Sequence, residues 1–163
     1  MKVMFICTGN ICRSAMAEGM MKKLVNKNNI KDIELCSCGI YAETGDYSTY
    51  NAIEAAKIYD ADISTHRATN IRDSKIEKMD VVLCATNSHK QNVLFLYPNL
   101  SGKVFTMKEY AGLDNNGQNM DINDPWGYDL NVYYNCAREI QECLEKIIEK
   151  IRNWIFVTRH LVK

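Results

Sequence analysis

The sequence has no excess of either charge, since 20 Lys and Arg residues balance 20 Asp and Glu residues. This balance argues against a surface for nucleic acid and against an attraction to membranes. No apolar run approaches the roughly 20 residues that span a bilayer, and residues 1–6 lack the cleavage pattern of a signal peptide. We therefore expect a cytoplasmic protein with neither nucleic acid nor membrane as a partner.

The sequence also lacks the even, regularly spaced cysteines of a secreted disulfide scaffold. It has seven cysteines, at positions 7, 12, 36, 38, 84, 136 and 143. Cys36 and Cys38 are separated by one residue instead of the two typical of a zinc knuckle, and no second pair completes a tetrahedral site. Reduced thiols, no metal and no cofactor are the expectation.

No repeat, low-complexity segment or linker divides the 163 residues, so we expect one domain over 1–163. Apolar runs and helical periodicity alternate along the chain. They predict strands at 3–6, 33–37, 80–84 and 103–106, helices at 14–28, 51–59, 88–96 and 130–152, and a polar loop at 113–119. Such alternation predicts an α/β fold, a four-stranded parallel sheet with helices on both faces.

Between the first strand and the first helix lies the string Cys-Thr-Gly-Asn-Ile-Cys-Arg-Ser, residues 7–14. A loop that enters a helix N-terminus gathers backbone N–H groups that bind anions. A cysteine there is favoured as the nucleophilic thiolate, and Arg13 offers a planar fork of donors to an oxyanion. Gly9 permits close backbone approach, and Asn10 tolerates left-handed geometry. The alternative, an inert buried cysteine, does not account for the whole string.

This loop resembles the phosphate-binding loop of the low-molecular-weight protein tyrosine phosphatase family. The similarity continues through 15–18, Ser-Cys-Gly-Ile at 37–40, Asp-Ile-Ser-Thr-His-Arg at 62–67 and Asp-Pro-Trp-Gly at 124–127, and covers about residues 2–152. It implies a phosphatase without metal that forms a phosphocysteine on Cys7, acts on phosphorylated proteins and releases inorganic phosphate. The phosphate-binding residues implied are Thr8, Gly9, Asn10, Ile11, Cys12, Arg13 and Ser14.

The resemblance assigns the general acid to Asp124. Pro125 disfavours helix at the residue before it, so Asp124 is expected on a loop from which its carboxyl can lean over a pocket. Asp121 is a reserve candidate. The alternative is that the Asp-Pro pair only begins a turn ahead of the last helix, with Asp129 as the helix N-cap.

The resemblance also implies supporting roles around the loop. Ser14 donates a hydrogen bond to the Cys7 sulfur, and Ser37 and His66, with Ser14, hold the Asn10 side chain. His89 and His160 are left as ordinary surface or core residues. In family members that have a second loop cysteine, here Cys12, oxidation joins the pair as a reversible disulfide.

Three other functions compete with tyrosine dephosphorylation. A thiol-dependent arsenate reductase shares the loop and has Cys84 in place, but Gln91 stands where a resolving cysteine is needed. A non-catalytic phosphate-binding module usually lacks the nucleophile or the acid, and both are present. A protein arginine phosphatase, from a branch of the same family, is the nearest rival.

Position 11 discriminates between these two phosphatases. Arginine phosphatases resemble one another in having threonine there, whereas Ile11 favours an aromatic ring and leaves guanidinium donors unpaired, at about 1–3 kcal/mol for each buried group. We therefore predict phosphotyrosine as the substrate. Trp126 and Tyr41 are expected to wall the slot, with Tyr128 and Tyr47 as alternatives. The sequence leaves open the oligomeric state and the role of residues 153–163, which extend the helix, pack on the surface or mediate self-association.

Overall fold

The protein is built on a four-stranded parallel sheet in the order β2-β1-β3-β4. The computed structural model describes residues 1–113, 117 and 119–161. The strands are β1 (Lys2–Cys7), β2 (Glu34–Gly39), β3 (Val81–Cys84) and β4 (Val104–Thr106). All three pairings are parallel, as predicted, and each predicted strand is found within two residues of its expected ends.

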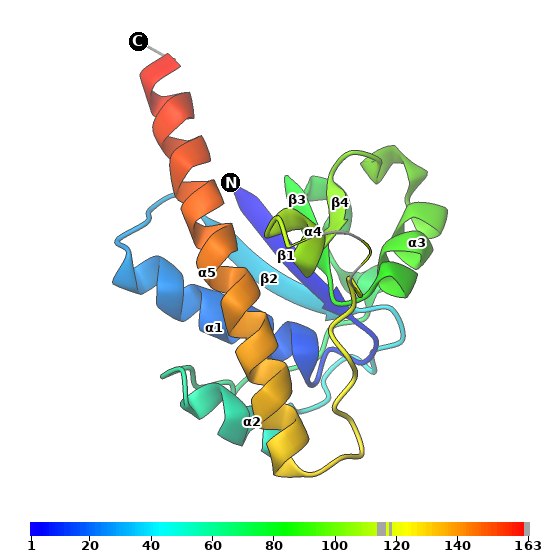
Figure 1. Ribbon diagram of the computed structural model, residues 1–163. Coiled ribbons are helices and arrows are strands. Elements are labelled where there is room, and N and C mark those ends of the chain that lie inside the picture. The colour runs from blue at the N-terminus through cyan, green and yellow to red at the C-terminus, as the bar shows by residue number, and fades with distance from the viewer. Residues whose placement is uncertain (114–116, 118, 162–163) are drawn as a thin grey trace.

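Helices cover both faces of the sheet (Figure 1). They are α1 (Arg13–Lys27), α2 (Tyr50–Lys57), α3 (Asn87–Leu96), α4 (Met107–Tyr110) and α5 (Leu130–Leu161). Three short 3₁₀ turns, η1 (Ile71–Asp73), η2 (Ile76–Lys78) and η3 (Pro98–Leu100), complete the fold. The predicted loop at 113–119 lies partly outside the described residues.

The central strand β1 is buried on both faces, which explains its continuous apolar run. Val3 and Phe5 pack in the core cluster shared with α1, α2 and α5. Met4 and Ile6 point the opposite way, into a second cluster with residues of η1, η2 and α3. Because successive strand residues alternate faces, β1 supports both layers of the molecule.

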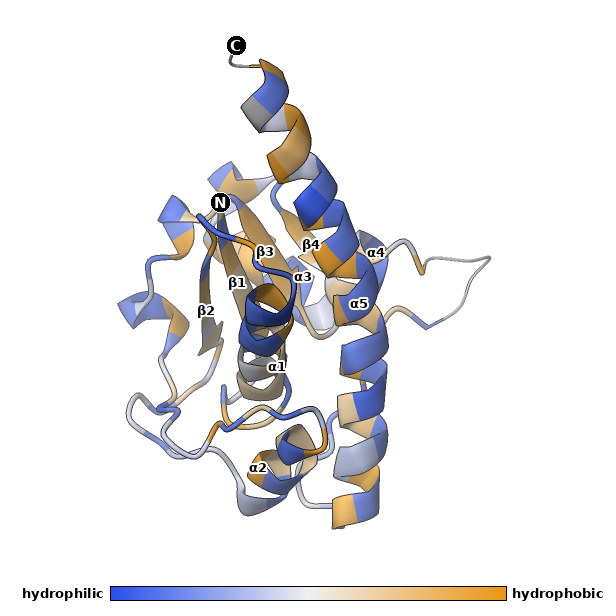
Figure 2. Cartoon of the chain, turned by 90° about the vertical axis from the view of Figure 1, so that its left-hand side faces the viewer, coloured by the Kyte–Doolittle hydropathy of each residue, from blue (hydrophilic) through white to orange (hydrophobic). Residues whose placement is uncertain are grey.

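Helix α5 is longer than predicted. Its apolar stripe, expected to end at about Arg152, is buried as far as Ile151, but the helix continues to Leu161. No proline or glycine interrupts 152–161, so nothing in the chain breaks the helix there. In Figures 1 and 2 this last part projects beyond the rest of the molecule.

The sequence reading missed α4, although its signal was present. Thr106 accepts a hydrogen bond from the backbone of Glu109, and the Glu109 side chain accepts one from the backbone of Thr106. This capping box follows the Thr-x-x-Glu pattern and begins the helix directly after β4. Among the described helices, none is long and apolar enough to cross a membrane.

Candidate active site

The loop of residues 7–14 connects β1 to α1 at the carboxyl edge of the sheet. The chain continues from β1 to β2 on one side, whereas β3 lies on the other side, so the loop lies where the strand order reverses, the usual ligand position in such sheets. Asn10 has φ 56°, which agrees with the predicted left-handed geometry. Close packing against the loop requires glycine at position 39. A Cβ at Gly39 would lie 2.5 Å from the Thr8 carbonyl oxygen and 2.8 Å from the Asn10 nitrogen. A Cβ at Gly9 would make only ordinary van der Waals contacts.

The Cys7 sulfur receives two polar contacts from its own loop. The Ser14 hydroxyl lies 2.9 Å from it, and the Asn10 backbone N–H donates to it at 3.3 Å. The Asn10 side-chain amide donates to Ser14 Oγ at 2.8 Å, so the serine's own hydrogen is free to point at the sulfur. Both donors stabilise a thiolate at Cys7.

Arg13 begins α1 and is almost fully buried, with 4% of its surface exposed. Its Nη1 donates to the Ile122 carbonyl at 3.0 Å, and its Nη2 lies 3.5 Å from Asp124 Oδ2. Its buried Nε has no hydrogen-bond partner within the described residues. A buried N–H donor without a partner at a helix N-terminus is well placed to donate a hydrogen bond to a bound oxyanion.

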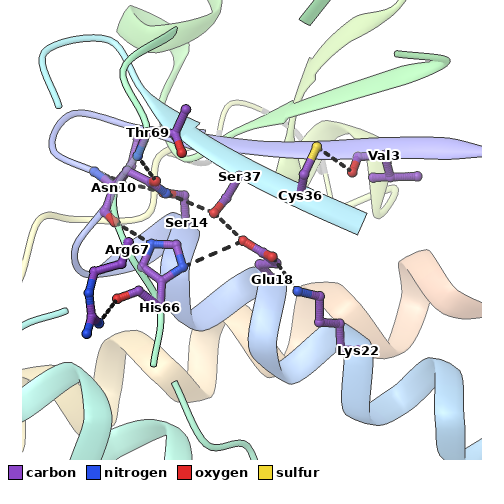
Figure 3. A network of polar contacts seen from close by, with 11 residues as sticks. Val3, Asn10, Ser14, Glu18, Lys22, Cys36, Ser37, His66, Arg67 and Thr69 are labelled. Atoms are coloured by element: carbon purple, nitrogen blue, oxygen red, sulfur yellow. Dashed lines mark hydrogen bonds and ion pairs between the residues drawn. The ribbon is translucent and has the colours of Figure 1, made fainter. Parts of the chain in front are cut away.

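Asn10 is held from three sides, as Figure 3 shows. Its side-chain amide also donates to Ser37 Oγ at 2.9 Å, and its side-chain oxygen accepts from the Thr69 backbone N–H at 2.9 Å. The expectation that His66 holds the Asn10 side chain was wrong. His66 Nε2 instead donates to the backbone carbonyl of Asn10 at 2.8 Å, because the backbone of Thr69 occupies the amide oxygen.

Glu18 is a member of this network that the sequence reading did not assign. Its carboxylate accepts a short hydrogen bond from Ser37 Oγ, pairs with Lys22 and lies 3.8 Å from His66 Nδ1. Since the Ser37 hydroxyl donates to the carboxylate, its oxygen is left to accept from Asn10. The position of Glu18 one turn into α1 was the available signal, because an acidic residue there faces the loop that precedes the helix.

The carboxyl of Asp124 lies at the mouth of a cavity of about 220 Å³ above Cys7. This cavity is lined by Cys7, Thr8, Gly9, Ile11, Cys12, Arg13, Asp124 and Trp126. The side chain of Asp124 is 52% exposed. Asp121 is occupied elsewhere, accepting from the Asn87 backbone at 2.7 Å, and Asp129 accepts from the Val132 backbone as the cap of α5. The structure confirms Asp129 as the helix N-cap, and the role of Asp124 as the general acid stays a prediction.

Of the proposed aromatic walls, Trp126 lines the cavity and Tyr41 does not. Tyr41 is 72% exposed and contributes its backbone N–H to the Thr8 carbonyl. The alternatives Tyr47 and Tyr128 also lie outside the cavity wall. Tyr47 instead stacks under the Arg67 guanidinium, 3.6 Å from its ring centre. The apolar walls of the cavity are thus Ile11 and Trp126.

A further contact ties the loop to α3. His89, at the start of α3, bridges Thr8 Oγ1 at 2.8 Å and Thr86 Oγ1 at 2.9 Å. Burial, with a smaller effect of nearby Arg13, lowers the pKa of His89 to about 4, so the imidazole is neutral at physiological pH. The prediction left His89 without a role because no local pattern connects α3 with a loop 80 residues earlier.

Cys12 lies in the same cavity wall, beside two hydroxyls. Its sulfur is 3.5 Å from Thr49 Oγ1 and 3.4 Å from the Tyr133 hydroxyl. Burial raises the pKa of Cys12, which keeps it a thiol at neutral pH. Among the residues described, no group of three or more His, Cys, Asp or Glu side chains could hold a metal ion.

The sequence is similar to known proteins over nearly its whole length. The family described as low molecular weight phosphotyrosine protein phosphatase matches residues 2–155. A protein-arginine-phosphatase of Bacillus subtilis is 30% identical over 153 residues, which are 93% of this chain and 97% of that protein. The low molecular weight protein-tyrosine-phosphatase PtpB of Staphylococcus epidermidis is 32% identical over 148 residues, 90% and 96% of the two chains. The crystal structure of a low molecular weight protein tyrosine phosphatase from T. tengcongensis is 39% identical with a TM-score of 0.83, and the similarity covers 92% of this chain and 99% of that one.

Proposed function

Because the chain belongs to the low molecular weight phosphotyrosine protein phosphatase family, whose members are cysteine-dependent hydrolases, we propose that it hydrolyses phosphotyrosine in proteins through a phosphocysteine on Cys7. One observation carries the choice of substrate. The cavity above the Cys7 sulfur has the apolar side chains of Ile11 and Trp126 as walls, and a phenyl ring packs well between such groups.

In the first step the Cys7 sulfur attacks phosphorus, and an S–P bond forms as the bond to the tyrosine oxygen breaks. Arg13 and the loop N–H groups hold the three equatorial oxygens. Asp124 gives its proton to the departing phenolate oxygen, which leaves as tyrosine. General acid catalysis of this kind is worth about 10²–10⁴-fold in rate. The position of the Asp124 carboxyl supports this role, since it lines the cavity above Cys7 and lies 3.5 Å from the arginine that would bind the phosphoryl group.

In the second step the Asp124 carboxylate takes a proton from water as the water oxygen attacks phosphorus. The S–P bond breaks, inorganic phosphate leaves and the Cys7 thiolate is restored. Ser14, 2.9 Å from the sulfur, stabilises the thiolate as it leaves. The step needs no metal or cofactor.

The second candidate is hydrolysis of phosphoarginine. It is favoured by the 30% identity to the arginine phosphatase of Bacillus subtilis. Against it, Ile11 offers no hydrogen-bond acceptor from its side chain, so that a guanidinium in this cavity loses a partner for at least one N–H. Phosphotyrosine is therefore the function that we propose.

The test compares phosphate release from phosphotyrosine and phosphoarginine peptides under the same conditions without added metal. The Cys7→Ser variant serves as the control for background hydrolysis. Faster release from phosphotyrosine supports the proposal. Faster release from phosphoarginine replaces it with the second candidate, and release from neither contradicts both.

We further infer that peroxide reversibly inactivates the enzyme by joining Cys7 and Cys12. Both sulfurs belong to residues that line one cavity. The two thiols are oxidised to a disulfide while peroxide is reduced to water. Inactivated protein should regain activity with a thiol reductant, and a Cys12→Ser variant should not. Failure of the wild-type protein to recover would count against this inference.

A further inference from the structure

The end of α5 is an apolar surface on a segment that extends past the rest of the fold. We call residues 152–161 the tail. Trp154, Val157 and Leu161, spaced three and four residues apart, share one face of the helix and are 50%, 51% and 79% exposed. The opposite side of the helix is different, because Ile155 is half-buried against the core cluster. Figure 2 shows hydrophobic colouring on the projecting end of the helix.

The charge of this end has one sign. From residue 150 onward the sequence contains Lys150, Arg152, Arg159 and Lys163 and no Asp or Glu. Lys31, which follows α1, lines a cavity of about 230 Å³ together with Arg152, Ile155 and Phe156. Glu145 and Glu149, on the preceding turns of α5, line a separate cavity together with Arg152, and Asp32 follows Lys31 in the sequence. The net charge of the whole chain is zero because an acidic excess in residues 1–149 equals the basic excess of residues 150–163.

We propose that the tail docks on an anionic lipid surface. The tail combines aromatic and aliphatic side chains on one helix face with a sequence, residues 150–163, whose charged residues are all basic. These features bind a helix within the headgroup region of a bilayer. Trp154 provides an amphipathic ring suited to that region. The expectation that no membrane is a partner rested on total charge and on the absence of a 20-residue span, and neither property bears on docking of this kind.

Pairing of two tails in a dimer of this chain is less favourable. It would bring together two segments that are both basic by sequence, with no carboxylate in residues 152–161 of either copy to compensate. An anionic surface provides the missing counter-charges.

The position of the tail suits a docked enzyme. The candidate active site lies beside the start of α5, and the tail is the other end of the same 32-residue helix, about 45 Å away at 1.5 Å per residue. None of the residues that line the cavity above Cys7 belongs to the tail, so docking by the tail leaves those residues free for substrate.

The test uses the full-length chain with vesicles of phosphatidylcholine, with and without phosphatidylglycerol, in a co-sedimentation assay. Binding is expected only to the vesicles that contain phosphatidylglycerol, and raised salt should weaken it. The double variant Trp154→Ser, Leu161→Ser should bind at least roughly tenfold less. The control Phe95→Ser, which removes an apolar side chain of 85% exposure on α3, should bind as the wild type does.

A charge reversal tests the electrostatic part. Arg152→Glu should weaken binding roughly fivefold or more, whereas Arg72→Glu, the same charge change on the exposed η1 turn, should have little effect. All variants should retain phosphatase activity on a soluble peptide, which shows that they fold. Equal binding to both vesicle types, no binding at all, or a tail-dependent dimer without vesicle binding would overturn the proposal.

Discussion

The substitution Ile11→Thr tests how the cavity selects its substrate. Ile11 is half-buried and lines the cavity together with Trp126, and its backbone carbonyl accepts from the Thr49 N–H at 3.1 Å. Threonine is also β-branched, so the backbone and this hydrogen bond should be retained. The change replaces apolar contact with one hydroxyl.

The expected effects have opposite signs for the two substrates. A phenyl ring loses contact with one to two carbon groups, worth about 1 kcal/mol at partial burial, so kcat/KM for phosphotyrosine should fall roughly fivefold. A guanidinium gains an acceptor for one N–H, worth about 1–3 kcal/mol, so kcat/KM for phosphoarginine should rise roughly 5- to 150-fold. The ratio of the two values should therefore shift by at least about 25-fold.

The assay measures kcat/KM for matched peptides that differ only in the phosphorylated residue. Ile11→Val is the control, since it trims the side chain and keeps it apolar. If Ile11→Thr and Ile11→Val shift the ratio equally, side-chain size and not the hydroxyl decides the preference. No shift in either variant would refute the assignment of Ile11 as the selecting residue.

Three other substitutions test the site. Asp124→Ala should slow release of poor leaving groups such as unsubstituted phenol by about 10²–10⁴-fold and release of p-nitrophenol far less; equal slowing would argue against Asp124 as the acid. Glu18→Gln removes the charge that holds Ser37, so kcat should fall roughly tenfold, at unchanged pH optimum, for a loss of about 1–1.5 kcal/mol; full activity would mean that Asn10 is held without Glu18. The pKa of His89, about 4 against an ordinary 6.5, means that the unfolded chain binds a proton that the folded protein does not. Stability should therefore fall by about 3 kcal/mol between pH 6.5 and 4, and urea unfolding of His89→Gln should lack that part of the decline.

The elements that local sequence determines could be predicted. The run from Val3 to Ile6 is apolar at every position because both faces of β1 are covered. The stripe of Tyr133, Cys136 and Ile140 recurs at helical spacing because one face of α5 packs on the core. The spacing of apolar residues reflects which side chains are buried, so this spacing predicted the strands and the long helices.

The candidate site was predicted where the resemblance named residues and was incomplete elsewhere. Cys7, Arg13 and Ser14 lie within the single stretch 7–14, so the connectivity of the chain keeps them close. Thr69 and His89 contact that loop from elsewhere in the fold, and Glu18 acts on it through Ser37. No spacing in the chain predicts such contacts. The resemblance assigned His66 to the Asn10 side chain, but in the structure the Thr69 backbone binds the Asn10 amide oxygen and His66 binds the Asn10 backbone. A family resemblance does not fix which of two neighbouring residues makes a contact.

The sequence by itself determined the order of strands and helices, the nucleophilic loop and the basic composition of the C-terminal end, because these depend on neighbouring residues. Only the tertiary structure decided that Ile11 and Trp126, and not Tyr41, wall the cavity, and that the end of α5 projects beyond the rest of the fold while Ile155 still packs against the core (Figure 1). The physical reason is the same in both cases. Which side chains remain exposed depends on what the rest of the chain packs against, and that is fixed only when segments distant in sequence meet.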